Sequence, residues 1–167
     1  MRRPLVLLAV SIAALAYAWT ARGGDEAPAR ELTGRVVRIV DGDTIRVALG
    51  PRVERVRYIG VDTPEDVKPD TPVQCYARRA AAENARLVAG RRVRLVLDVE
   101  ERDRFGRLLA YVYRASDGLF VNAALVRGGF ARTLTIPPNV RFADRLAALA
   151  RTARRESRGL WSACASA

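Results

Sequence analysis

The chain has 167 residues, 50% of them hydrophobic, which is enough for one domain with a sizeable core. Its formal net charge of +11 favours an anionic partner, such as nucleic acid or a membrane surface. The absence of histidine excludes histidine-dependent nucleases, Ser/His/Asp hydrolases and zinc–histidine sites, so any chemistry must use carboxylates and arginines, with or without a hard metal ion.

Residues 1–18 are typical of a secretory signal peptide. Two N-terminal arginines precede an apolar stretch over residues 5–16, and Ala16, Tyr17 and Ala18 form a small-x-small cleavage site. We expect cleavage after Ala18 and a secreted or periplasmic protein. An uncleaved N-terminal anchor, which would hold the protein at a membrane, is the alternative.

Residues 19–33 contain glycine, proline and mixed charges without periodicity, and they are predicted to form a flexible tether to a domain spanning residues 34–163. Two β-rich runs, residues 35–40 and 44–50, are separated by a tight Asp/Gly turn and predict a hairpin. A third β-rich run over residues 53–61 follows directly, so three strands precede the first helix.

The first helix is predicted to begin near Thr71 as its N-cap, with Pro72 in the first helical position and Gln74 as a capping-box partner. It is expected to end at Gly90. The inner face of this helix is expected to carry Tyr76, Ala80, Leu87 and Val88.

Two further strands are predicted over residues 91–99 and 107–113, followed by a short helix over residues 121–129 and a final amphipathic helix over residues 141–159. The inner face of that last helix is expected to carry Phe142, Leu146, Leu149 and Ala153. The order β-β-β-α-β-β with short linkers fits an α+β, mainly β fold, namely a five-stranded OB-type β-barrel with about three helices.

Three segments carry closely spaced acidic and basic residues near strand ends. They are IVDGDT with Asp41 and Asp43, VRYIGVDTPE with Arg57, Asp62 and Glu65, and RDRFGRLLAY with Arg107. Each segment alone is compatible with an ordinary turn or a solvated strand end. Together they offer what phosphodiester hydrolysis requires: carboxylates for a hard cation, forked donors for phosphate oxygens, and a spare carboxylate to activate water.

With these motifs in order between Arg35 and Trp161, together with GR-L-AY and VN-ALVR-G-A, the chain resembles the staphylococcal nuclease family of thermonuclease-like, Ca²⁺-dependent enzymes. The resemblance implies a Ca²⁺ cofactor held by the carboxylates of Asp43 and Asp62 and by the backbone carbonyl of Thr63. It also implies DNA and RNA as substrates, hydrolysed with little sequence specificity to 3′-phosphorylated products, and no stable protein partner is inferred.

The same resemblance implies roles for the other site residues. Glu65 corresponds to the general base, Arg57 and Arg107 to two arginines that hold the scissile phosphate, and Asp41 to an outer-shell carboxylate. Relatives place tyrosines against the substrate base; here Phe105 occupies the first such position, where it can stack on a base, and the loop TLTIPPNV has no tyrosine. The alternative to an enzyme is a non-catalytic nucleic-acid-binding OB-fold module, because nuclease-like domains also occur without active-site residues.

The chain has two cysteines, Cys75 in the first turn of the first predicted helix and Cys164 after the last helix. In an exported protein this pair predicts one disulfide that holds the C-terminal segment. Two unpaired thiols are the alternative.

Overall fold

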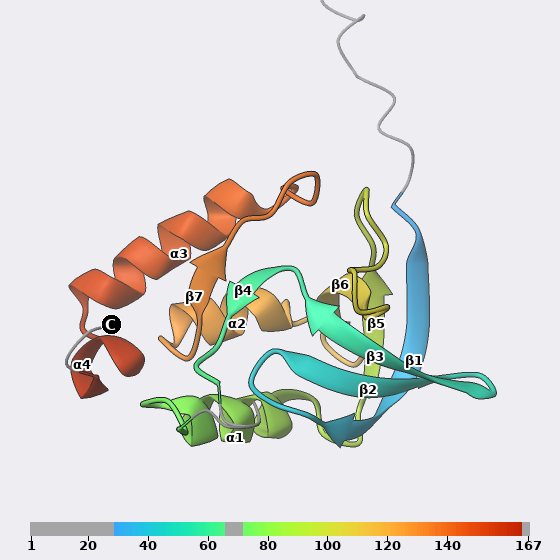
Figure 1. Ribbon diagram of the computed structural model, residues 1–167, viewed down its shortest axis with the longest axis horizontal. Coiled ribbons are helices and arrows are strands. Elements are labelled where there is room, and N and C mark those ends of the chain that lie inside the picture. Colours follow the sequence, from blue (N-terminus) through green and yellow to red (C-terminus); the bar gives the residue numbers. More distant parts are fainter. Residues whose placement is uncertain (1–28, 66–71, 165–167) are drawn as a thin grey trace, which may run out of the picture.

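The computed structural model describes residues 29–65 and 72–164 of the chain (Figure 1). Five strands close into a barrel: β1 (Glu31–Ile39), β2 (Thr44–Leu49), β3 (Arg52–Tyr58), β5 (Arg92–Val96) and β6 (Leu108–Arg114). Their order is β1-β2-β3-β6-β5, and neighbouring strands are antiparallel except β3 and β6, which run parallel. The predicted five-stranded, mainly β barrel is therefore confirmed, whereas the expected signal peptide lies outside the described residues.

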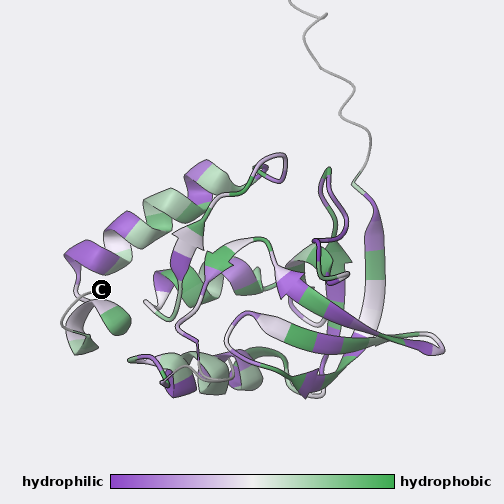
Figure 2. Ribbon diagram, viewed as in Figure 1, coloured by the Kyte–Doolittle hydropathy of each residue, from purple (hydrophilic) through white to green (hydrophobic). Residues whose placement is uncertain are grey.

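Alternating side chains explain why these runs form a barrel. In β2, Ile45 and Val47 are fully buried, whereas Arg46 between them is exposed. Figure 2 shows hydrophilic and hydrophobic residues alternating along β1, β2 and β3. Because successive strand residues point to opposite faces, one face of each strand fills the barrel and the other faces outward.

The first strand begins earlier than predicted. β1 starts at Glu31, so residues 31–33, which were expected in the tether, belong to the barrel. Leu32 pairs with Leu95 of β5 and packs against the core. This pairing joins residues far apart in the sequence, so local composition did not reveal it.

The third predicted strand divides at Gly60. β3 ends at Tyr58, and the next three residues form β4 (Gly60–Asp62), which pairs antiparallel with β7 (Arg132–Leu134) in a separate two-stranded sheet. Gly60 has a φ of +78°, in the left-handed region that favours glycine. The change of direction carries Asp62 out of the barrel and onto the small sheet.

Four helices pack beside the strands: α1 (Ala77–Val88), α2 (Val121–Arg127), α3 (Ala143–Arg155) and the short α4 (Leu160–Ala163). In Figure 1, α1 lies below the barrel, and α3 and α4 lie beside β4 and β7, away from β1. The predicted inner-face residues Ala80, Leu87, Val88, Leu146 and Ala153 are buried. None of the helices in the described part of the chain is long and apolar enough to cross a membrane.

The predicted start of the first helix is wrong. α1 begins at Ala77, after Tyr76, whose φ of 72° is left-handed and interrupts the helix on its N-terminal side. Gln74 does not cap the helix, because its side-chain oxygen accepts a hydrogen bond from the Glu65 backbone N–H at 2.9 Å. Cys75 therefore lies before α1, and Thr71 lies outside the described residues.

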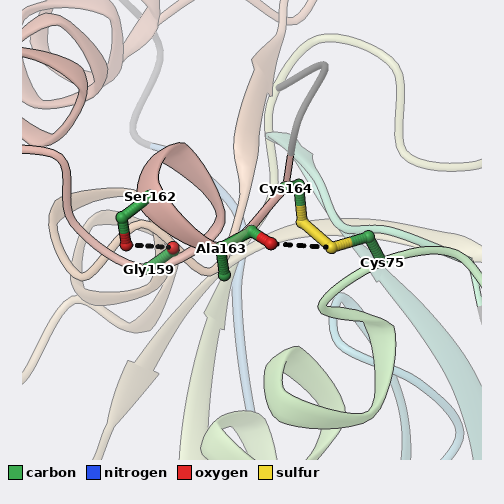
Figure 3. Close-up of a disulfide and its surroundings, with 5 residues drawn as sticks. All are labelled: Cys75, Gly159, Ser162, Ala163 and Cys164. Carbon is green, nitrogen blue, oxygen red and sulfur yellow. Dashed lines mark hydrogen bonds between the residues drawn. A yellow bond between two sulfur atoms is a disulfide. The ribbon is translucent and has the colours of Figure 1, made fainter.

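A disulfide joins Cys75 to Cys164, with a Cα–Cα distance of 5.9 Å. Figure 3 shows that it ties the segment before α1 to the residue that follows α4. The two cysteines are 89 residues apart in the sequence, so this bond connects both ends of the helical side of the domain.

Candidate active site

The turn between β1 and β2 places two buried carboxylates, Asp41 and Asp43, at one end of the barrel. The backbone N–H of Asp43 donates to Asp41 Oδ1 at 2.9 Å. From α1, Asn84 Nδ2 donates to the carbonyl oxygen of Asp41, also at 2.9 Å. The first bond closes the turn and the second fixes it against α1, so the backbone that carries both carboxylates is held in place.

Asp43 also holds the segment that follows β4. Its Oδ2 accepts hydrogen bonds from the backbone N–H of Thr63 at 2.9 Å and from Thr63 Oγ1 at 3.0 Å, while Thr44 Oγ1 donates to Oδ1 at 3.1 Å. Gly42 lets the two segments approach, because a Cβ added there would lie 2.6 Å from Thr63 Oγ1. The structure thus brings Thr63 directly to Asp43.

Arg57 of β3 connects the two predicted metal-ligating carboxylates. Its Nε lies 3.1 Å from Asp43 Oδ1 in an ion pair, and its Nη2 donates to Asp62 Oδ1, also at 3.1 Å. Its Nη1 donates to the carbonyl oxygens of Tyr58 at 2.8 Å and Val61 at 2.7 Å. Both N–H groups of Nη1 and one of Nη2 are therefore used within the protein, and an N–H on Nη2 is left for a substrate.

A cavity of about 190 Å³ collects every predicted metal-binding and catalytic residue. The predicted residues that line it are Asp41, Asp43, Arg57, Asp62, Thr63, Glu65 and Arg107, and Thr44 and Pro64 complete the lining. They come from the β1–β2 turn and the start of β2, the end of β3, the end of β4 and the segment after it, and the residue before β6. Three separated sequence motifs therefore meet in one polar cavity.

Arg107 is held in place by Asp103, which sequence reasoning did not single out. Asp103 Oδ2 accepts a hydrogen bond from Arg107 Nε at 2.6 Å, and its Oδ1 accepts from the backbone N–H groups of Phe105 and Arg107 at 3.0 Å. Burial opposes ionisation of Asp103, but these bonds outweigh it and lower the pKa of its carboxyl. Among residues 29–65 and 72–164, no hydrogen bond or ion pair occupies the Nη atoms of Arg107, which leaves both for phosphate oxygens.

Phe105 lies beside the site on a second cavity of about 420 Å³, which Leu134 and Ile136 also line. The two cavities share Arg57 and Arg107, so they adjoin. The Phe105 side chain is 67% exposed, as a stacking platform must be. The structure therefore places Phe105 next to the predicted phosphate-binding arginines.

Glu65 is supported through its backbone by Gln74, a second residue whose role the sequence did not reveal. Besides the bond from the Glu65 N–H to Gln74 Oε1, the Gln74 backbone N–H donates to the Glu65 carbonyl at 2.9 Å. The sequence had indicated a different role for Gln74, as a capping-box partner in the first helix. The pairing fixes the position of Glu65 relative to the start of α1.

The carboxylates of the site repel one another and are partly desolvated. Burial, together with the charge of Asp43, raises the pKa of Asp41 from 3.8 to about 6. Burial also raises the pKa of Asp62, against the opposing effect of Arg57. A bound cation would relieve this crowding of negative charge.

The donors available to a metal ion are carboxylate and carbonyl oxygens. In the described part of the chain, no three His, Cys, Asp or Glu side chains converge closely enough to hold a metal ion by themselves. A cation here would need Asp43, Asp62, a backbone carbonyl such as that of Thr63, and water. Such a mixed set of oxygen donors suits a hard cation with flexible coordination.

Comparison with known proteins identifies the family. The family model described as staphylococcal nuclease homologue matches residues 55–163 of the chain. The chain is 40% identical over 134 residues to the thermonuclease of Staphylococcus hyicus, which covers 80% of the chain and 78% of that protein. The chain belongs to the staphylococcal nuclease family. Its match to the thermonuclease of Staphylococcus intermedius is 41% identical over 126 residues, covering 75% of the chain and 74% of that protein.

The chain is also similar to the SPbeta prophage-derived endonuclease YokF of Bacillus subtilis. The two are 40% identical over 127 residues, which cover 75% of this chain and 42% of that protein. The region that matches the staphylococcal nuclease model contains Arg57, Asp62, Glu65 and Arg107. Asp43 precedes that region and reaches the same cavity through the β1–β2 turn. Family membership and geometry therefore point to one site.

Proposed function

We propose that the protein is a calcium-dependent endonuclease that hydrolyses DNA and RNA with little sequence specificity and releases 3′-phosphorylated products. Membership of the staphylococcal nuclease family supports nuclease activity. The observation that carries the proposal is one polar cavity that collects three aspartates, a glutamate and two arginines. A non-catalytic OB-fold binding module would have no need of that combination.

Calcium would be held by the carboxylates of Asp43 and Asp62 and by the backbone carbonyl of Thr63. When bound, it would supply positive charge that stabilises the phosphorane-like transition state. The fit rests on the oxygen-only donor set and on the burial of Asp41 and Asp62, which raises the pKa of each carboxyl and disfavours its charged form unless a cation is near. Asp41 would not bind the ion directly; its side chain would hold the backbone of Asp43 by accepting the Asp43 N–H.

The side chains of the cavity divide the remaining chemistry. Glu65 takes a proton from the water that attacks phosphorus, so a new P–O bond forms as the bond to the 5′ oxygen breaks. Arg107 presents two Nη atoms to the phosphate oxygens and balances charge on the leaving 5′ oxygen, which then takes a proton from solvent. Arg57 contributes an N–H on Nη2 while it keeps Asp43 and Asp62 in place.

We also propose that the protein is exported, on the basis of the signal-like sequence of residues 1–18. N-terminal sequencing of protein made in its own host should then begin at Trp19. A membrane-bound product that retains residues 1–18 would indicate an anchor instead.

The activity is tested with the purified domain on denatured DNA and on RNA, in Ca²⁺ and in excess EGTA. We expect hydrolysis of both polymers in Ca²⁺, products that end in 3′-phosphate, and loss of activity in EGTA. Mg²⁺ should substitute poorly because it demands stricter octahedral geometry. Full activity in EGTA would contradict calcium dependence, and binding without hydrolysis would support the OB-fold module.

A further inference from the structure

Three exposed arginines lie side by side on the outer surface of the barrel. In the strand register, Arg38 of β1 is opposite Arg46 of β2, and Arg46 is opposite Arg55 of β3. All three are exposed. Because neighbouring strands are about 4.8 Å apart, this arginine row spans about 10 Å across the strands.

The barrel itself does not explain the arginine row. Like charges directly opposite one another in a sheet destabilise it. Within residues 29–65 and 72–164, none of the three arginines has a hydrogen bond or an ion pair. By contrast, the neighbouring Arg102 is paired with Glu54 at 3.0 Å. Nothing in the described fold compensates the repulsion, so an external anion is the natural counter-charge.

The arginine row continues into the active-site cavity. Arg46 and Arg55 lie two residues along their strands from Thr44 and Arg57, which are paired with each other and line the cavity. Two residues of strand correspond to about 7 Å, and residues two apart share a face. Arg46 and Arg55 therefore each lie one same-face position away from a residue that lines the cavity.

We propose that the arginine row binds the sugar–phosphate backbone of the substrate strand beyond the scissile bond. Exposed guanidinium groups spaced along a shallow surface suit repeated phosphates, and they contact backbone rather than bases, so they would add affinity without sequence preference. The inference rests on the proposed nuclease function for the identity of the anion. It adds a binding surface outside the cavity, which should favour long substrates over short ones.

The test uses the triple variant Arg38→Gln, Arg46→Gln, Arg55→Gln. On single-stranded DNA of about 30 nucleotides in Ca²⁺, kcat/KM should fall about tenfold at low salt. The slope of log(kcat/KM) against log salt should become shallower by about 2, because each lost phosphate contact contributes about 0.7. On a dinucleotide the loss should be less than about twofold, because the short substrate does not reach the row. Equal losses on both substrates, or none on the long one, would overturn the proposal.

The matched control is Arg127→Gln, Arg151→Gln, Arg155→Gln, which removes the same charge from exposed positions on α2 and α3. A similar loss in the control would mean that net charge alone matters, which would also overturn the proposal. The affinity for the same labelled DNA is measured in EGTA by fluorescence anisotropy, with anionic lipid vesicles as a second probe. An inactive parent protein would refute the proposed function. Even then, weaker DNA binding by the arginine-row variant, with unchanged binding by the control, would support the arginine row as a binding surface for the DNA backbone. Weaker binding to vesicles without weaker binding to DNA would refute that proposal.

Discussion

Arg57 and Arg107 carry the same charge into the cavity but differ in what else they support. Arg57 joins Asp43 and Asp62 and also donates to two backbone carbonyls, whereas Arg107 donates from Nε to Asp103 and lies over the ring of Phe105. The first arginine is therefore partly structural. The second is poised mainly for substrate.

This difference predicts distinct results for lysine substitutions. Arg107→Lys should lower turnover on single-stranded DNA by about a hundredfold with little change in Tm, because paired donation to phosphate is lost. Arg57→Lys should lower both turnover and Tm, since a lysine cannot make the same set of bonds. Rates and thermal melts of both variants check this, and an unchanged Tm for Arg57→Lys would contradict the structural part of its role.

The buried, charged carboxylate of Asp41 lowers the stability of the folded protein at neutral pH. Its pKa of about 6 exceeds the unfolded value of 3.8, so the folded protein binds more protons between these pH values. Stability therefore falls as the pH rises through this range, and above it the charged carboxylate is unfavourable. Asp41→Asn keeps an acceptor for the Asp43 N–H while removing this charge.

We expect Asp41→Asn to raise the free energy of unfolding at pH 7 in EGTA by about 1 to 3 kcal/mol. At pH 4 the gain should be smaller, because Asp41 is then largely protonated in the folded protein. Urea unfolding at the two pH values measures both quantities. Equal effects at pH 4 and pH 7 would show that charge is not the cause.

At the scale of elements, the segment before α1 links stability to the site. Cys75 is bonded to Cys164, and its neighbour Gln74 makes two hydrogen bonds with the backbone of Glu65. Anchoring this segment should therefore both stabilise the fold and keep Glu65 in position. Gln74 and Cys75 both precede α1, so the connection that leads into this helix, and not the helix itself, supports Glu65.

Replacing both cysteines by serine should lower Tm, since closing a loop between cysteines 89 residues apart stabilises by about 4 to 5 kcal/mol before any strain is subtracted. Turnover measured well below the new Tm should also fall, by about two- to fivefold, because Glu65 loses part of its support. Dithiothreitol should reproduce both effects in the parent protein and change nothing in the serine variant. Unaltered melting of the serine variant would argue against a stabilising role.

The sequence predicted the barrel strands well because their alternation follows directly from burial of one face, as in Ile45 and Val47 around Arg46. It failed where tertiary contacts override local signals. Gln74 carries a capping pattern but bonds to Glu65 instead, and β7 is a three-residue strand that exists only by pairing with β4. The start of β1 likewise depends on pairing with β5.

The site was predictable as a set of residues but not as a supported arrangement. Three motifs, taken together, indicated the members of the cavity, and the topology brings them to one end of the barrel. The supporting residues Asp103, Gln74 and Asn84 were missed, because their partners are backbone groups or side chains that no sequence pattern identifies. Orientation of the catalytic groups therefore became visible only in the folded chain.

For the whole molecule, the formal charge of +11 would become +9 if cleavage after Ala18 removed two arginines, since 11 − 2 = 9. Some arginines are neutralised locally, such as Arg30 by Glu101 and Arg94 by Glu31. The arginine row is not, so it concentrates positive charge next to the cavity. Attraction of a polyanion to this side of the barrel should make hydrolysis strongly dependent on salt.

The most direct test of the account is the rate of hydrolysis of single-stranded DNA by Glu65→Gln in saturating Ca²⁺. The substitution keeps the size of the side chain but removes the base, so turnover should fall by about a hundredfold or more while Tm stays close to that of the parent protein. Glu83→Gln, on α1, is the matched control and should retain parental turnover. A well-folded Glu65→Gln protein with parental turnover would contradict the assignment of this cavity as the catalytic site.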